Sequence, residues 1–179
     1  MRPAGISTLT LVLTQALTAC GRSALPVAGP DATRHDQVVA MADGYAAGWP
    51  QLPRVNAAAL HAGTLREPVL VDCREAFEQD VSVLPGAVLQ SDYEAQLAAD
   101  PAAFVDRPVV VYCTIGYRSG EYAAALRQRG VDAYNLHGGV LEWAHAGGDF
   151  VTPHGTPTRS VHVYGRRWSL LPEGYDATY

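Results

Sequence analysis

The chain carries, at residues 108–119, the sequence PVVVYCTIGYRS, in which a run of β-branched residues leads directly to a cysteine. A continuous apolar run such as 108–112 is typical of a parallel strand that is buried on both faces. Cys113 follows this run at once, and residues 119–129 are expected to form a helix that ends at Gly130. Because open parallel sheets place reactive groups at the carboxyl ends of their strands, this position favours a functional role for Cys113.

The rest of the chain alternates between strand-like and helix-like segments. Further strands are expected at 68–71 and 131–136, where apolar and β-branched residues cluster. Helices are expected at 35–47, at 57–61 after a capping Asn56, from the capping-box pair Ser91 and Glu94 to about Ala99, and around Trp143 after Gly138-Gly139. The alternation predicts an α/β domain built on a parallel sheet, without internal repeats.

Three features near Cys113 favour its thiolate over its thiol. Gly116 lets the loop turn its backbone N–H groups inward, the helix expected from Ser119 points the positive end of its dipole at the sulfur, and Arg118 adds a full charge. Together they are expected to lower the pKa of Cys113 from about 8.5 towards neutrality. The alternative is a buried structural cysteine, and the order strand, cysteine, glycine, arginine, helix argues against it.

Composition excludes several classes of function. All 13 cationic side chains are arginines, so chemistry that needs a lysine Schiff base or a lysine base is absent. The net charge is -5 and the only adjacent basic pair is Arg166-Arg167, which argues against a nucleic-acid partner. Three cysteines cannot form a disulfide framework, and no cysteine–histidine cluster has the spacing of a zinc site. We therefore expect neither a metal nor a cofactor.

The first residues have the pattern of a targeting signal. An apolar run from Ile6 to Ala19 is too short to span a bilayer but suits the core of a signal peptide. It ends in Leu17-Thr18-Ala19-Cys20, which resembles the lipobox of bacterial lipoproteins, in which the cysteine is acylated and becomes the mature N-terminus. A plain secretion signal and a packed N-terminal helix are the alternatives. The resemblance implies a lipid-anchored protein of the bacterial cell envelope, on the periplasmic side.

Four motifs, in order, make residues 50–150 similar to the rhodaneses, or single-domain sulfurtransferases. They are VDCRE at 71–75, LPGAV at 84–88, CTIGYRS at 113–119 and NLHGGVLEW at 135–143. The resemblance implies a sheet of about five parallel strands with helices on both faces. It divides the chain into a signal peptide at 1–19, a lipid-anchored tether at 20–33, the rhodanese-like domain at 34–150, and an extension at 151–179 that packs on the domain.

The resemblance also implies a chemistry. Cys113 would take a sulfane sulfur from a small donor such as thiosulfate, hold it as a persulfide, and pass it to a thiol or cyanide-like acceptor. The residues expected to bind donor and persulfide are Thr114, Ile115, Gly116, Tyr117, Arg118 and Ser119. We expect a monomer. The alternatives are a non-catalytic interaction or persulfide-carrier module at the membrane surface, and a phosphatase or arsenate reductase. The spacing Cys-x4-Arg disfavours the latter, because related phosphatases use Cys-x5-Arg in a longer loop.

Two further positions and the tail are assigned less directly. Asp72 and Arg74 are expected to form a structural pair, with a role in lining the pocket as the alternative. Cys73 stands where an aliphatic residue is usual, and we expect it to point into the packed layer under the sheet with a geometry that does not allow a disulfide. The alternative is that Cys73 lies close enough to Cys113 to pair with it, because both follow strands of one sheet edge. In the tail, polar and apolar residues alternate at 160–165 as in a strand. We expect the tail to pack on the domain surface. The alternative is that His162 or Trp168 shapes the rim of the active site or a partner site.

Overall fold

The computed structural model describes residues 29–179. The signal peptide expected at 1–19, the acylation site at Cys20 and most of the expected tether lie outside the described residues. Within the described part, no helix is both long enough and apolar enough to cross a membrane.

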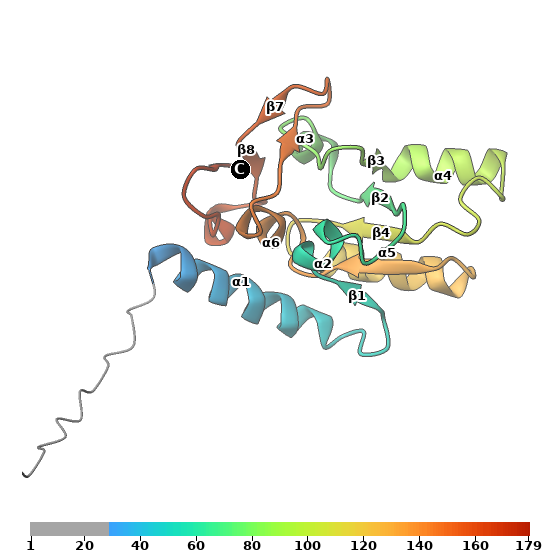
Figure 1. Cartoon of the computed structure of the whole chain (residues 1–179), viewed down its shortest axis with the longest axis horizontal. Helices are drawn as coiled ribbons and strands as arrows, with labels where there is room; N and C mark the ends of the chain where they lie inside the picture. Colours follow the sequence, from blue (N-terminus) through green and yellow to red (C-terminus); the bar gives the residue numbers. More distant parts are fainter. Residues whose placement is uncertain (1–28) are drawn as a thin grey trace, which may run out of the picture.

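A five-stranded sheet forms the centre of the molecule (Figure 1). Its order is β1-β5-β4-β2-β3, and every neighbouring pair is parallel. This confirms the predicted α/β fold. The strands are β1 (Arg54–Val55), β2 (Val69–Asp72), β3 (Val88–Leu89), β4 (Val109–Tyr112) and β5 (Ala133–Leu136).

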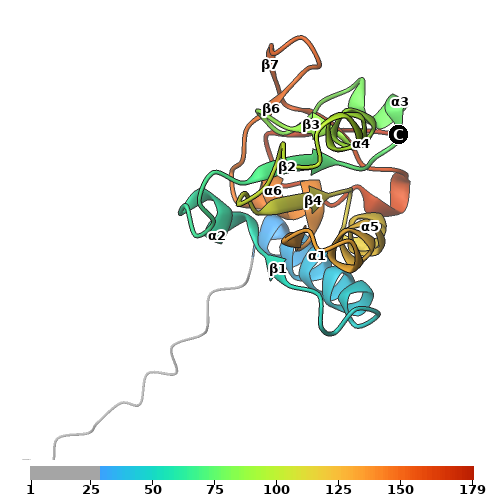
Figure 2. The same cartoon turned by 90° about the vertical axis from the view of Figure 1, so that its right-hand side faces the viewer.

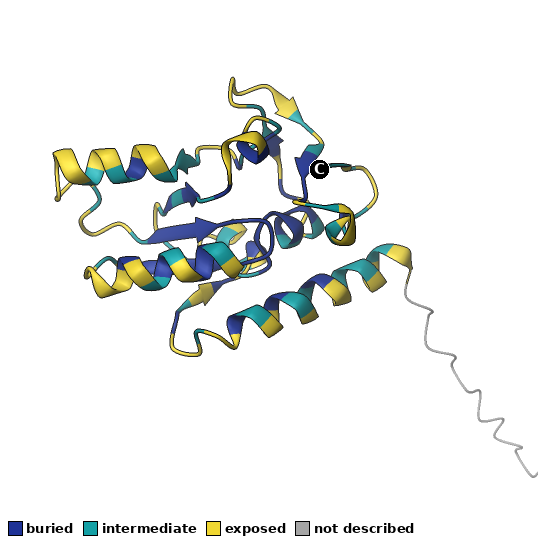
Figure 3. Ribbon diagram, turned by 180° about the vertical axis from the view of Figure 1, so that it is seen from behind, coloured by how far each residue is buried: buried dark blue, intermediate teal, exposed yellow. Residues whose placement is uncertain are grey.

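Helices cover both faces of the sheet, as the sequence predicts. The first apolar cluster joins one face of the sheet to α1 (Pro30–Ala46), α2 (Ala57–His61) and α6 (Gly139–His145). The second cluster joins the other face to α4 (Gln90–Ala99) and α5 (Tyr117–Gln128). Strand β4 lies between the two layers and all four of its residues are buried (Figure 3). Because side chains alternate along a strand, Val109 and Val111 belong to the second cluster, and Val110 and Tyr112 to the first.

Three helix starts differ from the sequence expectation. Helix α1 begins at Pro30, so residues 30–33 are helical and do not belong to a tether; proline suits the first turn, where its missing N–H needs no partner. Helix α5 begins at Tyr117, two residues early, because Gly116 adopts φ 109° just before it. Helix α4 has no capping box: it begins at Gln90, and the Glu94 carboxylate instead pairs with Arg129.

The C-terminal segment is part of the packed structure. It contains β6 (Phe150–Val151), β7 (Pro157–Thr158), β8 (Ser160–His162), the short 3-10 helix η1 (Arg166–Trp168) and β9 (Asp176–Thr178). Val161, Val163 and Leu171 enter the first cluster. Strand β8 lies beside α3 (Ala76–Gln79), a one-turn helix that the sequence did not indicate (Figure 1). The C-terminus also lies near α3 (Figures 1 and 2). The C-terminal segment therefore packs against the first cluster of the domain.

Candidate active site

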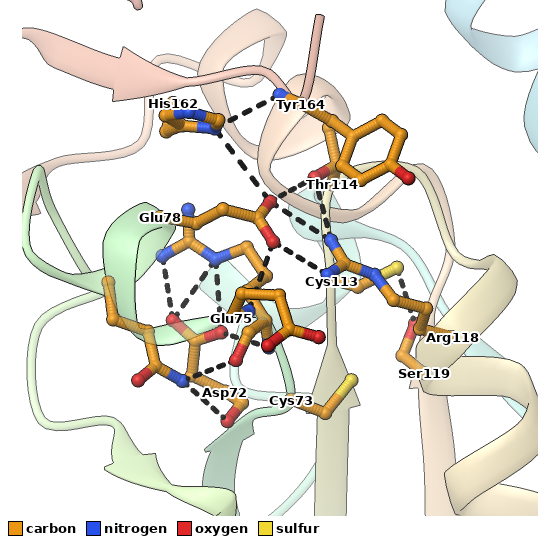
Figure 4. Close-up of polar contacts among 12 residues, drawn as sticks. Asp72, Cys73, Glu75, Glu78, Cys113, Thr114, Arg118, Ser119, His162 and Tyr164 are labelled. Carbon is orange, nitrogen blue, oxygen red and sulfur yellow. Dashed lines mark hydrogen bonds and ion pairs between the residues drawn. The ribbon is translucent and has the colours of Figure 1, made fainter. Parts of the chain in front are cut away.

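Cys113 lies at the carboxyl end of β4, beside Arg118 and Ser119 of the first turn of α5 (Figure 4). Its side chain is buried, and its sulfur accepts hydrogen bonds from the backbone N–H of Gly116 at 3.2 Å and from the Ser119 hydroxyl at 3.4 Å. The positive φ of Gly116 turns that N–H towards the sulfur, and a side chain at this position would be strained. The loop is thus a cradle of hydrogen-bond donors around the Cys113 sulfur.

Burial by itself raises the pKa of Cys113, because a thiolate loses its hydration. Hydrogen bonds outweigh burial: the Cys73 thiol, the Ser119 hydroxyl and the backbone N–H groups of Ser119 and Ile115 all favour the anion. The pKa of Cys113 is consequently well below that of an ordinary thiol. A sulfur held in this way is a preformed nucleophile that needs no neighbouring base.

Asn135 supports the cradle from β5, a role that the sequence analysis missed. Its amide N–H donates to the Gly116 carbonyl at 2.9 Å, and its Oδ1 accepts from the Ser119 hydroxyl at 2.7 Å. The Ser119 hydroxyl has one proton, which Asn135 and the Cys113 sulfur both compete for, and the shorter contact is with Asn135. A polar residue inside an otherwise apolar strand was the available signal, because buried amides need partners.

An ion pair between a buried carboxylate and a partly exposed arginine lies next to the cradle. The Arg118 guanidinium donates to both carboxylate oxygens of Glu78, at 2.6 and 2.9 Å, and Glu78 also accepts from the Thr114 hydroxyl at 3.0 Å. Burial raises the pKa of Glu78, but Arg118 and the other donors lower it further, so the net direction is down. Glu78 was not predicted as a site residue. The positive charge of its partner Arg118 is therefore largely compensated by the Glu78 carboxylate.

The start of α6, after the turn that follows β5, is hydrogen-bonded to the backbone of the cysteine loop. The backbone N–H of Val140 donates to the Cys113 carbonyl at 3.0 Å, and that of Leu141 donates to the Thr114 carbonyl at 3.3 Å. This approach requires glycine at position 139, where a Cβ would lie 2.2 Å from the Cys113 carbonyl oxygen. Gly139 therefore lets α6 dock directly against the cysteine loop.

A half-open cavity of about 330 Å³ lies over the sulfur. Its walls are aromatic and come from distant segments: Tyr45 of α1, Tyr117 of α5, and Tyr164 and Trp168 of the C-terminal segment. Trp168 stacks on Tyr45 with ring centres 6.0 Å apart. No sequence feature had indicated that Tyr45 or Tyr164 belongs to the site. Larger hollows of about 740 and 690 Å³ elsewhere in the described part contain no thiol.

The structure distributes the predicted site residues over three roles. Thr114, Ile115, Tyr117 and Arg118 line the cavity with Cys113. Gly116 and Ser119 hold the sulfur from within. Asp72 and Arg74 form a fully buried pair at 2.7 Å whose arginine also donates to the Ser82 carbonyl, and neither residue lines the cavity. This geometry agrees with the structural interpretation of the pair.

Among the hydrogen bonds of the described residues, none joins His162, at the end of β8, to Cys113. Its Nδ1 accepts a hydrogen bond from the Tyr164 backbone N–H at 3.1 Å, which leaves that nitrogen unprotonated. Glu78 lies 4.0 Å away, beyond hydrogen-bond distance. Burial lowers the pKa of His162, so the ring is neutral. Trp168, by contrast, does reach the rim of the cavity.

The exposure of Cys73 and its position relative to Cys113 differ from the expectation. It packs against the second cluster, but it is only half-buried, and its thiol lies beside Cys113 (Figure 4). The Cys73 thiol donates to the Tyr112 carbonyl at 3.2 Å, and its interaction with Cys113 raises its pKa. Cys73 thus packs in the layer under the sheet, as expected, but on a strand position next to that of Cys113. The register of the two strands explains it, because Asp72 and Tyr112 are paired and the two cysteines follow them.

No group of three or more potential metal ligands occurs in residues 29–179. The site that the described residues define is a thiol site.

Comparison with known proteins identifies the family of the domain that carries this site. The model of the Rhodanese-like domain matches residues 56–146, and the chain belongs to this family. The tRNA uridine(34) hydroxylase of Burkholderia ambifaria is 32% identical over 133 residues, covering 63% of this chain and 47% of that protein. The protein of the same name from Cupriavidus metallidurans is 30% identical over 128 residues, covering 60% and 45%. The chain thus spans about half the length of these curated relatives.

Two solved structures are also similar. The thiosulfate sulfurtransferase of Pseudomonas aeruginosa is 23% identical, with a TM-score of 0.49, over 68% of this chain and 24% of that one. A rhodanese-related protein of Thermoplasma volcanium is 24% identical, with a TM-score of 0.47, over 55% of this chain and 97% of that one.

Proposed function

We propose that this protein transfers sulfane sulfur, carrying it as a persulfide on Cys113. The observation that carries the proposal is the low-pKa, buried Cys113 sulfur within a loop of N–H and O–H donors. Such a loop stabilises a negative charge on sulfur both before and after a second sulfur atom is added. Membership of the rhodanese-like family supports the same chemistry.

The reaction has two steps with thiosulfate as the donor. The Cys113 thiolate attacks the outer sulfur of thiosulfate, the bond between the two sulfur atoms breaks, and sulfite leaves with the bonding electron pair. The loop N–H groups then face the new persulfide anion. A nucleophilic acceptor, a thiolate or cyanide, attacks the terminal sulfur, and the Cys113 thiolate leaves and is regenerated.

Phosphate chemistry is less well supported. A cysteine phosphatase needs a free arginine to grip two phosphate oxygens. Here Arg118 already makes two hydrogen bonds to Glu78, and the donors around Cys113 converge on a single sulfur. The hydroxylase activity in the names of the relatives belongs to proteins of which this chain covers 47%, and we do not carry it over.

Intact-protein mass spectrometry after incubation with thiosulfate tests the proposal. Wild-type protein that is quenched immediately after mixing, before a later step can release the sulfur, should have gained the mass of one sulfur atom on the peptide that contains Cys113, and Cys113→Ser should gain nothing. Cys113→Ser should also lose the thiosulfate:cyanide activity while its thermal melt stays unchanged, since a serine hydroxyl is not ionised at neutral pH. Sulfur loading that survives Cys113→Ser, or Cys113-dependent phosphate release as fast as sulfur transfer, would overturn it.

A further inference from the structure

We propose that Cys73 is a resolving thiol: it attacks the Cys113 persulfide, closes a Cys73–Cys113 disulfide and releases the carried sulfur as hydrosulfide. This inference rests on the proposed persulfide and deepens it, because it names the product and the partner that turnover requires.

The sheet register brings the two cysteines together. Strands β2 and β4 are paired in parallel from Val69 with Val109 to Asp72 with Tyr112, and the cysteines are the next residues on each strand. The backbone N–H of Cys73 still donates to the Tyr112 carbonyl at 3.1 Å, so the ladder continues to this point. Neighbouring strands lie about 4.8 Å apart, inside the Cα separation of about 4.4–6.8 Å that a disulfide needs.

Both side chains also leave the sheet on the same face. Val71 and Val111, two residues earlier on each strand, are buried in the second cluster. Because side chains alternate, Cys73 and Cys113 point towards that same layer. The pKa of each cysteine depends on the other, and both are free thiols in the structure. The pair therefore consists of neighbouring, unbridged cysteines on one face of the sheet.

The protonation states suit a reaction that starts only after loading. The hydrogen bond to Cys113 raises the pKa of Cys73, and burial and the nearby negative charges add to this, so Cys73 keeps its proton while Cys113 is a thiolate. In the persulfide the negative charge moves to the outer sulfur, and the inner sulfur is no longer an anion. The main cause that holds the proton on Cys73 is then weakened.

The step balances without an outside oxidant. The Cys73 sulfur forms a bond to the inner sulfur of the Cys113 persulfide, and the bond between the inner and outer sulfurs breaks. The outer sulfur leaves with the electron pair, takes the Cys73 proton and departs as hydrosulfide. The sulfane sulfur is reduced by two electrons, and the two cysteine sulfurs are oxidised by one each. A dithiol reductant then reopens the disulfide by exchange.

A single-turnover experiment without an acceptor tests this. Reduced protein is freed of reductant under anaerobic conditions and mixed with thiosulfate, and released sulfide and the state of both cysteines are measured. Wild-type protein should release one sulfide per sulfur loaded. It should also yield a disulfide-linked pair of tryptic peptides, residues 67–74 with residues 75–118, because trypsin does not cleave between Arg107 and Pro108.

Cys73→Ser is the matched variant, since serine keeps a proton donor towards Cys113 but cannot form a disulfide. Once loaded with sulfur, it should keep the Cys113 persulfide and release sulfide, per sulfur loaded, at least about tenfold more slowly than the wild type. An equally stable persulfide in wild type and Cys73→Ser would overturn this inference alone. Failure of both proteins to load sulfur would overturn the proposed function and this inference with it. Thermal melts of both proteins exclude misfolding as the cause of either result.

Discussion

The guanidinium of Arg118 and the carboxylate of Glu78 face each other in a two-point ion pair beside the cysteine loop, with Glu78 fully buried and Arg118 partly exposed. The cation that should attract an anionic donor is thus also the partner of a buried carboxylate. Its contribution to stability and its contribution to binding cannot be separated by removing Arg118 alone.

Arg118→Ala is expected to lower the free energy of unfolding by about 3–5 kcal/mol, because it leaves the Glu78 carboxylate buried and unpaired. The double variant Glu78→Gln/Arg118→Ala should recover a large part of the loss, since no buried charge remains. Urea unfolding of the wild type, both single variants and the double variant measures the coupling. Strictly additive losses would contradict the ion pair.

Stability should fall in acid partly through Glu78. Its pKa is lowered in the folded state, so its contribution is complete above the unfolded pKa of about 4.3 and is lost as the pH falls through the folded value. Urea unfolding between about pH 6 and pH 3 should show a steeper loss for the wild type than for Glu78→Gln. Parallel curves would show that Glu78 is not the group involved.

Cys113 should react with iodoacetamide at pH values well below those at which an ordinary thiol reacts, because its pKa is lowered. Cys73 should react only in alkali, because its pKa is raised. Cys73→Ala removes a donor and should raise the pKa of Cys113, whereas Cys73→Ser should change it less. Peptide-resolved alkylation rates across pH give both values. The same pH profile in all three proteins would show that Cys73 does not affect the pKa of Cys113.

Gly139→Ala should destabilise the fold far more than Gly147→Ala. Both glycines have positive φ, so alanine costs about 1–2 kcal/mol at either position. At Gly139 the new methyl group also meets the Cys113 carbonyl, whereas at Gly147 it meets no atom within 4 Å. Chemical denaturation and the thiosulfate assay should show both losses for Gly139→Ala. Equal destabilisation by the two substitutions would mean that the loop does not depend on this close approach.

We propose that the mature protein is held at the membrane by lipid on Cys20, a prediction that rests on Leu17-Thr18-Ala19-Cys20. More than one acyl chain is needed for a stable anchor, because each buried CH₂ contributes only about 0.8 kcal/mol. Wild-type protein should incorporate labelled fatty acid and sediment with membranes. Cys20→Ala should appear as unprocessed precursor or in the soluble fraction. An unlabelled, soluble wild type would leave the plain secretion signal as the better interpretation.

The local features of the site were readable along the chain. The apolar run before Cys113, the flexible Gly116 and the following helix are contiguous, so their periodicity and spacing predict a thiol at the end of a buried strand. The order of the four motifs indicated the family. Strands β1 and β3 escaped notice because each has two residues, too few to show a period.

The remaining parts of the site depend on contacts between residues far apart in sequence. Glu78 is 40 residues from Arg118, and Asn135 is 16 residues from Ser119. The strand order β5-β4-β2 places their segments on either side of Cys113, and the same pairing turns Cys73 from an expected filler residue into a neighbour of the nucleophile. Tyr45 and Trp168 meet over the cavity only because α1 and the C-terminal segment pack together. Sequence periodicity encodes which residues are buried, but strand register and layer packing decide which buried groups touch, and hydrogen bonds and ion pairs act only over those few ångströms.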